Sequence, residues 1–294
     1  MRITDANRTR DVLANLNRSE RALDRAQQAI SSGLRVRRAS DDPGAALTVL
    51  KLTGSSTAAT QHRRNIDAAL SRVGSEESAL DQLSETLSRA RELAVAQGSD
   101  TSSAATRAQT RVEVDKLIEF AVQLGNTRGP DGYLFGGYRS DQRPFATPLD
   151  PTVTAVGAGE QRQVEIGPGQ RVNTVHNARE VFVDTGAMAA LKQLSTALGA
   201  NDAAGIRSAA GALQTGFDGV QGILAETGSR YGQLELTATR LDTLEQTTSA
   251  HRASIQEADM EATMVELVTR QSSLQATMLS TSRILGMTLS EYLR

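Results

Sequence analysis

Side chains that commonly do chemistry are few and scattered in this sequence. Its three histidines, His62, His176 and His251, lie far apart and outside any HExxH motif, and the absence of cysteine removes thiolate ligands and a thiol nucleophile. There is no GxSxG motif and no lysine-bearing phosphate loop. The sequence therefore predicts a protein that is not an enzyme and that holds no metal and no cofactor.

Two charged segments and two glycine turns have simple structural interpretations. The DDPG segment at 41–44 could hold a cation, but carboxylates before Pro-Gly are typical of a turn and a helix N-cap. The RVRR run at 35–38 stands in a chain of net charge −2, where such a run is typically solvated or ion-paired. The glycines at 157–159 and 167–169 introduce no helix after a strand, so we expect hairpin turns. No nucleic-acid partner is expected.

The composition favours thin helix-on-helix packing over the thick core of a compact enzyme. The 294 residues include 5 Phe, 4 Tyr and no Trp, and the hydrophobic fraction is 39%. The first twenty residues carry charges throughout and lack the apolar segment of a Sec-type signal peptide. No run of about 18 apolar residues occurs, so no membrane-spanning helix is expected.

The prolines separate the middle of the chain from two helical flanks. Five of the six prolines lie within residues 130–168, which leaves long stretches free for continuous helices. In the first flank Leu16, Leu23 and Ile30 recur every seven residues, the spacing of a coiled-coil seam. The last flank predicts one unbroken helix over 231–293. Its seven-residue ladder comprises Leu234, Leu241, Thr248, Ile255, Ala262, Thr269 and Ala276.

The fold class predicted from these patterns is mainly α. Long N- and C-terminal helices pair as a coiled coil and continue into a rod-like helical bundle with a small β-rich insertion, which includes a hairpin over 161–175. The expected bundle helices cover 66–94, 112–124, 187–198 and 206–224. The expected domains are terminal helices at 1–44 and 255–294, a rod bundle at 45–128 and 187–254, and a proline-rich β domain at 129–186.

The end of the last helix carries apolar residues on several faces, too many for one partner helix to cover. We therefore expect this end to be buried by assembly with other copies, with the N-terminal seam as its partner within the chain. A charge at Leu274 or Leu279 should then abolish incorporation. The predicted assembly contacts are Leu16, Leu23, Ile30, Ile255, Val265, Leu274, Leu279 and Leu285.

Two blocks at matching ends of the chain resemble the flagellin-like axial proteins of the bacterial flagellum. They are QQAISSGLRVRRASDDPGAALTV at 27–49 and IQEADMEATMVELVTRQSSLQATMLSTSRILGMTLSEYLR at 255–294. Within that family, DDP at 41–43, GNTRGPDGYLFGGYRSDQRPF at 125–145 and the ending LSEYLR resemble the members that join hook to filament. Glu291 departs from the aromatic residue that is common near that terminus.

This resemblance implies a structural adaptor that is secreted to the extracellular flagellum through the flagellar type III apparatus. The partners it implies are flagellin above, a hook-associated protein below, other copies of the chain in a ring at the junction, and a cytoplasmic export chaperone. Neither nucleic acid nor a membrane is among them. The aromatics of the YLFGGY segment at 133–138 are interpreted first as local core and second as a partner surface.

Two other functions remain open at this point. A filament flagellin would polymerise alone into long tubes, whereas a junction protein should not elongate. A cytosolic coiled-coil scaffold would be a stable dimer with ordered ends, so protease-sensitive termini in the monomer would argue against it.

Overall fold

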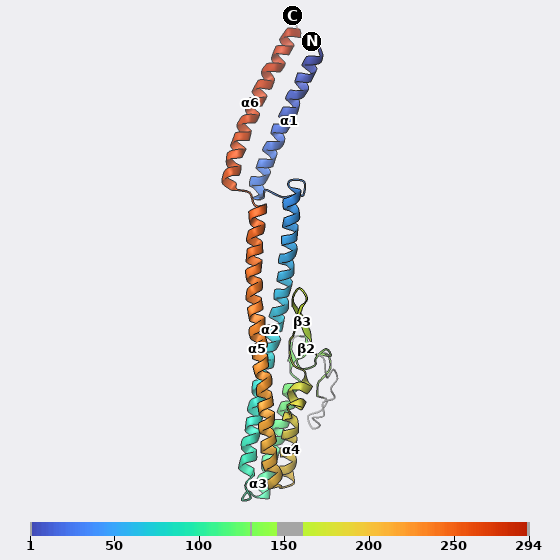
Figure 1. Ribbon diagram of the computed structural model, residues 1–294, viewed down its shortest axis with the longest axis vertical. Coiled ribbons are helices and arrows are strands. Elements are labelled where there is room, and N and C mark those ends of the chain that lie inside the picture. Colours follow the sequence, from blue (N-terminus) through green and yellow to red (C-terminus); the bar gives the residue numbers. More distant parts are fainter. Residues whose placement is uncertain (1, 130, 146–160, 293–294) are drawn as a thin grey trace. The chain divides into compact units, whose positions relative to one another are not determined.

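The computed structural model describes residues 2–129, 131–145 and 161–292, and shows long helices with two small antiparallel strand pairs (Figure 1). This confirms the mainly α fold class. Contacts divide the chain into two units, Met1–Thr57 with Leu244–Arg294 (unit 1) and Ala58–Thr243 (unit 2). The elements are α1 (Arg2–Ser32), α2 (Pro43–Gln97), α3 (Ala104–Gly125), β1 (Arg128–Gly129), β2 (Gly132–Tyr133), β3 (Gln163–Gly167), β4 (Gln170–Asn173), the π-helix η1 (Arg179–Asp184), α4 (Ala187–Gly199), α5 (Ala203–Gln256) and α6 (Met260–Tyr292).

Unit 2 contains a four-helix bundle with a continuous apolar core. Parts of α2, α3, α4 and α5 contribute fully buried side chains, among them Leu83, Leu191 and Leu213. These helices are amphipathic, and packing their apolar faces together removes that surface from water. The α3 helix begins at Ala104, where the side chain of the N-cap residue Ser103 accepts a hydrogen bond from the Thr106 backbone N–H at 3.1 Å.

The aromatics of the middle segment belong to the bundle core. Phe182 of η1 meets Phe135 and Phe145 edge-on, with ring centroids 5.4 Å apart in each pair. Gly125 allows this close packing, because a Cβ there would lie 2.2 Å from the Phe145 ring. Tyr133 is also buried, whereas Tyr138 is exposed. The core interpretation of the YLFGGY segment is therefore confirmed, apart from Tyr138.

The predicted β-hairpin forms and rests on the long helices of unit 2. Strands β3 and β4 are antiparallel, with Val164 opposite Val172 and the GPG glycines at the turn. Ile166 packs in a second apolar cluster with Ile66 of α2 and Leu234 of α5. The GAG turn predicted at 157–159 lies outside the described residues.

Unit 1 pairs the two ends of the chain. Helices α1 and α6 lie side by side (Figure 1), as the coiled-coil prediction requires. An antiparallel bridge pairs Leu34, just after α1, with Glu257, just before α6. Beside it, the Arg35 backbone N–H donates to the Gln256 carbonyl at 2.8 Å. In the described residues, no helix is both long and apolar enough to cross a membrane.

The C-terminal helix differs from the prediction in two ways. The α5 helix is a single element from Ala203, although the sequence predicted separate helices over 206–224 and from 231. It also ends at Gln256, so the helix predicted to run unbroken over 231–293 is interrupted. At the interruption the Gln256 carbonyl accepts a hydrogen bond from the distant Arg35 backbone N–H, and Asp259 caps the new helix by accepting one from the Ala262 backbone N–H at 3.1 Å. The finer three-part domain division stays a prediction.

Candidate assembly surface

The α1 helix presents a heptad seam in the α1–α6 pair. Val12, Leu16, Ser19, Leu23 and Ile30 are partly buried at alternating three- and four-residue steps that include the buried Ala26. This spacing keeps one stripe of a helix against a single partner. The sequence prediction of a seam through Leu16, Leu23 and Ile30 therefore agrees with their burial on one stripe of α1.

The α6 helix also has a partly buried stripe, but its residues are not those of the predicted seven-residue ladder. Its partly buried residues include Thr263, Leu267, Leu274 and Thr277, whereas Ala262, Thr269 and Ala276 of the predicted ladder are exposed. The ladder holds within α5, where Leu234, Leu241 and Thr248 are buried. Because residues 257–259 leave the helix, α6 starts again with a different face toward α1. The predicted ladder is wrong beyond Ile255.

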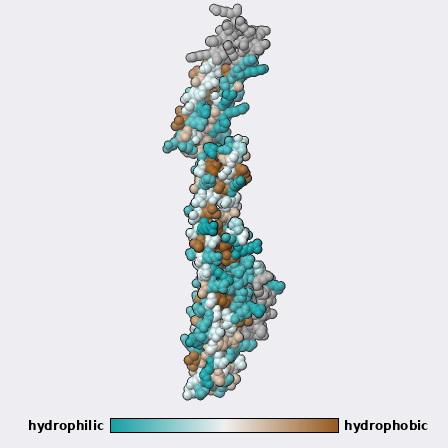
Figure 2. Space-filling model, viewed as in Figure 1, coloured by the Kyte–Doolittle hydropathy of each residue, from teal (hydrophilic) through white to brown (hydrophobic). Residues whose placement is uncertain are grey.

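A second face of α6 is apolar and exposed. Successive residues of an α-helix are about 100° apart around the helix axis. With that spacing, the exposed apolar residues of α6 fall within an arc of about 140°, and the centre of this arc lies roughly 120° from the partly buried stripe of α6. Figure 2 shows hydrophobic side chains at the surface of this helix pair, bordered by polar ones. We call this the α6 outer face, and it comprises Met260, Met264, Val265, Val268, Met278 and Leu279.

The predicted assembly residues fall into three groups. Leu16, Leu23, Ile30 and Leu274 are half-buried on the stripes described above, and Ile255 is half-buried near the end of α5. Val265 and Leu279 belong to the α6 outer face, with exposures of 68% and 66%. The side chain of Leu285 lies outside the described part of the chain. Their role as assembly contacts stays a prediction.

The list of predicted contacts omitted most of the α6 outer face. Met260, Met264, Val268 and Met278 are exposed on the same face as Val265 and Leu279, yet they were not among the predicted contacts. A helical wheel restarted at Met260 would have grouped them, because Met260, Met264 and Val268 recur every four residues. Grouping these residues from the sequence would have required knowing that the helix breaks before Met260.

The DDPG segment builds the joint between the terminal helices and the helices that follow. Asp41 Oδ2 accepts hydrogen bonds from the backbone N–H groups of Arg38 and Arg37, which lower the pKa of Asp41. Asp42 caps α2 by accepting from the Ala45 backbone N–H at 3.0 Å, which lowers the pKa of Asp42. Arg35 donates to the Ile255 carbonyl at 2.8 Å and lies 3.4 Å from Asp42. The predicted turn and N-cap are confirmed.

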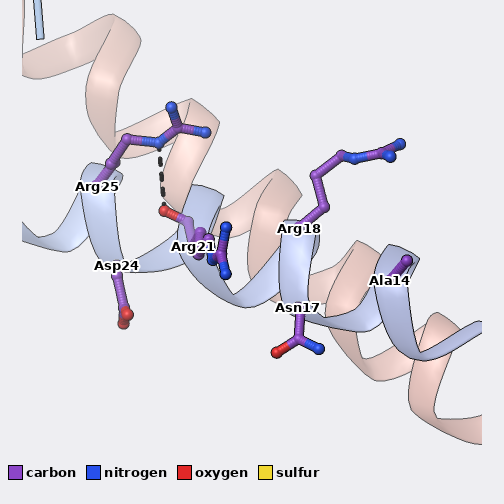
Figure 3. A pocket seen from close by; sticks show the side chains of 6 residues that line it. All are labelled: Ala14, Asn17, Arg18, Arg21, Asp24 and Arg25. Carbon is purple, nitrogen blue, oxygen red and sulfur yellow. Dashed lines mark hydrogen bonds between the residues drawn. The ribbon is translucent and has the colours of Figure 1, made fainter.

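A shallow groove runs along the outer side of α1 (Figure 3). Arg18 and Arg25 project to one side of the helix, and Asn17 and Asp24 to the other. Arg25 donates a hydrogen bond to the Arg21 backbone carbonyl at 3.3 Å. Within the described side chains, the residues that line this groove all come from α1, so they do not supply the converging groups that catalysis needs. Among the described residues, no group of three His, Cys, Asp or Glu side chains could hold a metal ion.

Comparisons with known proteins agree with this architecture. Residues 4–139 match the family described as bacterial flagellin N-terminal helical region. A flagellin of Halalkalibacterium halodurans is 26% identical over 88% of this chain and 85% of its own length. Flagellar hook-associated protein 3 of Escherichia coli is 27% identical over 64% of this chain and 59% of its own length.

The fold is also similar to a solved structure. The chain superposes on a structure described as a flagellar hook-associated protein from Vibrio parahaemolyticus with a TM-score of 0.66 and 20% sequence identity. The superposition covers 74% of this chain and 100% of the Vibrio chain. These comparisons show that residues 4–139 match the flagellin N-terminal helical region and that much of the chain is similar in sequence to flagellar proteins. Its fold is similar to that of the flagellar hook-associated protein from Vibrio parahaemolyticus.

Proposed function

We propose that the chain is a structural adaptor that joins the flagellar hook to the flagellin filament. Two relatives named hook-associated proteins support this proposal. The Escherichia coli protein matches in sequence over 64% of this chain, and the Vibrio protein matches in fold over 74% of it. The DDP turn and the YLFGGY segment add support, because in the sequence they favour the junction members over filament flagellins. Structural flagellar components, rather than enzymes, make up this group.

The observation that carries the proposal is the α6 outer face. Six large apolar side chains stay exposed on a helix whose other stripe already packs against α1. An exposed apolar face of this length marks an interaction surface in a soluble subunit. A helix pair with one covered stripe and one uncovered stripe is suited to packing against further helices in a tube wall.

The proposed partners follow from that surface. Other copies of the chain cover the α6 outer face in a ring at the junction, with flagellin on one side and a hook-associated protein on the other. A cytoplasmic export chaperone shields the same surface before assembly, since exposed apolar residues promote aggregation. The proposed location is the extracellular flagellum at the hook–filament junction.

Localisation and polymerisation test the proposal together. Antibody labelling of intact cells should mark one site at the base of each filament, and electron microscopy of concentrated purified protein should show no long tubes. Labelling along the whole filament, or spontaneous tubes, would instead identify a filament flagellin. This is the second candidate function, because the Halalkalibacterium relative is a flagellin. A stable cytosolic dimer would contradict both.

A further inference from the structure

A buried carboxylate and a buried imidazole face one another in unit 2. Glu76 of α2 has no exposed side-chain surface, and the side chain of His176, between β4 and η1, is 5% exposed. Glu76 Oε1 accepts hydrogen bonds from the His176 backbone N–H at 2.9 Å and from ring Nδ1 at 2.8 Å. An ionised carboxylate is costly to bury unless a cation or donors compensate it. The ring proton is therefore central to the stability of this contact.

The second ring nitrogen also faces a carboxylate. His176 Nε2 lies 3.4 Å from Glu226 Oε2 on α5, and Glu226 is hydrogen-bonded by Arg230 at 2.6 Å. Arg230 also donates to Gln161 at 3.3 Å. An imidazolium carries an N–H on each nitrogen, so this charged form alone can donate to both carboxylates. The geometry favours a protonated ring.

The other groups around the ring do not replace its charge. Glu76 Oε2 and Arg230 Nη1 are buried and have no hydrogen-bond partner among the described residues. Glu180 of η1 accepts from Gln161 and from the Asn177 backbone N–H instead. Loss of the His176 proton would thus leave Glu76 buried with a weaker partner, a change that costs stability.

The histidine also lies at the attachment of the β3–β4 hairpin. Thr174, two residues before it, donates through its backbone N–H and its hydroxyl to the Arg162 carbonyl across the base of the hairpin. The opposite end of the hairpin is held to α2 where Asn65 donates to the Glu165 carbonyl at 2.9 Å. His176 is thus the buried ionisable contact of this attachment, next to the more exposed ion pairs that Asp131 makes with Arg162 and with Arg72 of α2.

We propose that His176 is a proton-dependent latch that fastens the base of the β3–β4 hairpin to α2 and α5. The latch is closed when the ring is an imidazolium between Glu76 and Glu226, and it opens when the ring is neutral. Opening releases one proton and breaks the two bonds to Glu76 Oε1, and the bundle core stays folded. The base of the β3–β4 hairpin therefore loosens at alkaline pH, while the helices that it packs against stay folded.

The direction of the pH dependence follows from the balance at the ring. Burial lowers the pKa of His176 and the Arg230 charge lowers it further, but the hydrogen bond and charge of Glu76, together with the charge of Glu226, outweigh both, so the pKa is raised above 6.5. A raised pKa in the folded state contributes stability that is complete below 6.5 and is lost as the pH rises through the folded value. Within that window the opening equilibrium constant should rise up to about tenfold per pH unit.

Nuclear magnetic resonance and amide hydrogen exchange on the full chain test the latch. The His176 ring should titrate above 6.5, and the amides of residues 174–178 should lose protection over the same pH range, after correction for intrinsic exchange. The Val114 amide in the bundle core should keep its protection. His176→Gln should remove the pH dependence, whereas His251→Gln, at an exposed position of α5, should leave it intact.

Two results would overturn the latch. One is a His176 ring that titrates at or below 6.5 in the wild-type chain. The other is the same loss of protection at 174–178 in His176→Gln as in wild type. If His176→Gln does not fold, Glu226→Gln provides the second test, because Glu226 is partly exposed and Glu76 stays in place. It should lower the ring pKa and shift the loss of protection to lower pH, and an unchanged ring pKa would contradict the proposal.

Discussion

The bundle of unit 2 and the α1–α6 pair of unit 1 are both built from amphipathic helices, but they bury apolar residues to very different extents. In the bundle, leucines from α2, α4 and α5 are fully enclosed. In the pair, Ala26 is the one buried hydrophobic residue among the described side chains of α1 and α6. A helix with one neighbour can cover only one stripe, whereas a helix with three neighbours is enclosed. The bundle therefore encloses its apolar side chains within one chain, whereas the pair leaves the α6 outer face exposed.

The largest expected effect is a cavity in the bundle. Leu191→Ala removes a fully buried side chain and should lower the free energy of unfolding by about 2–5 kcal/mol. Leu23→Ala, at a half-buried seam position of α1, should cost less than about 1 kcal/mol in the monomer. Denaturant unfolding of each variant measures the difference. Equal losses would contradict the contrast between the two regions.

A glycine pair sharpens the same contrast within unit 2. Gly125→Ala would place a methyl group against the Phe145 ring and should destabilise the bundle by about 1–3 kcal/mol. Gly74→Ala, inside α2 with open space around it, should instead stabilise by about 0.5–1 kcal/mol. Thermal unfolding should show shifts of opposite sign. A Gly125→Ala variant that unfolds at or above the wild-type temperature would mean that close packing does not require Gly125.

A smaller effect is expected at the joint of unit 1. The pKa of Asp42 is lowered by its bond from the Ala45 N–H, so its contribution is present above 3.8 and is lost as the pH falls through the lowered value. Exchange of the Ala45 amide, after correction for the intrinsic rate, should therefore accelerate at acid pH, and Asp42→Ala should show the fast corrected rate throughout. Asp24→Ala, on the exposed side of α1, should leave that rate unchanged. Slow exchange in Asp42→Ala would show that the cap is not what protects the turn.

Much of the fold could be predicted from the sequence because its signals are local. Heptad spacing located the α1 seam, proline placement separated the middle from the flanks, and the DDPG residues indicated both the turn and the N-cap. The hairpin around the GPG turn followed from alternation of apolar residues. Each of these depends on residues within a few positions of one another.

The features that the sequence did not reveal depend on contacts between distant segments. The break after Gln256 needs the backbone of Arg35 to take the free carbonyl at the end of α5, 221 positions away in the chain. The Glu76–His176 contact spans 100 positions, and no spacing rule connects the two residues. The α6 outer face was only partly predicted, because its phase depends on that break.

The central claim is that the α6 outer face is covered when the protein assembles. Leu279 tests it better than Leu274, because Leu274 lies on the partly buried stripe and a charge there would disturb the pair itself. Leu279→Glu should leave the circular dichroism of the monomer unchanged and abolish incorporation at the hook tip. Ser273→Glu, exposed and about 120° round the helix, is the matched control and should incorporate. Normal filament growth from the Leu279→Glu variant would contradict the account.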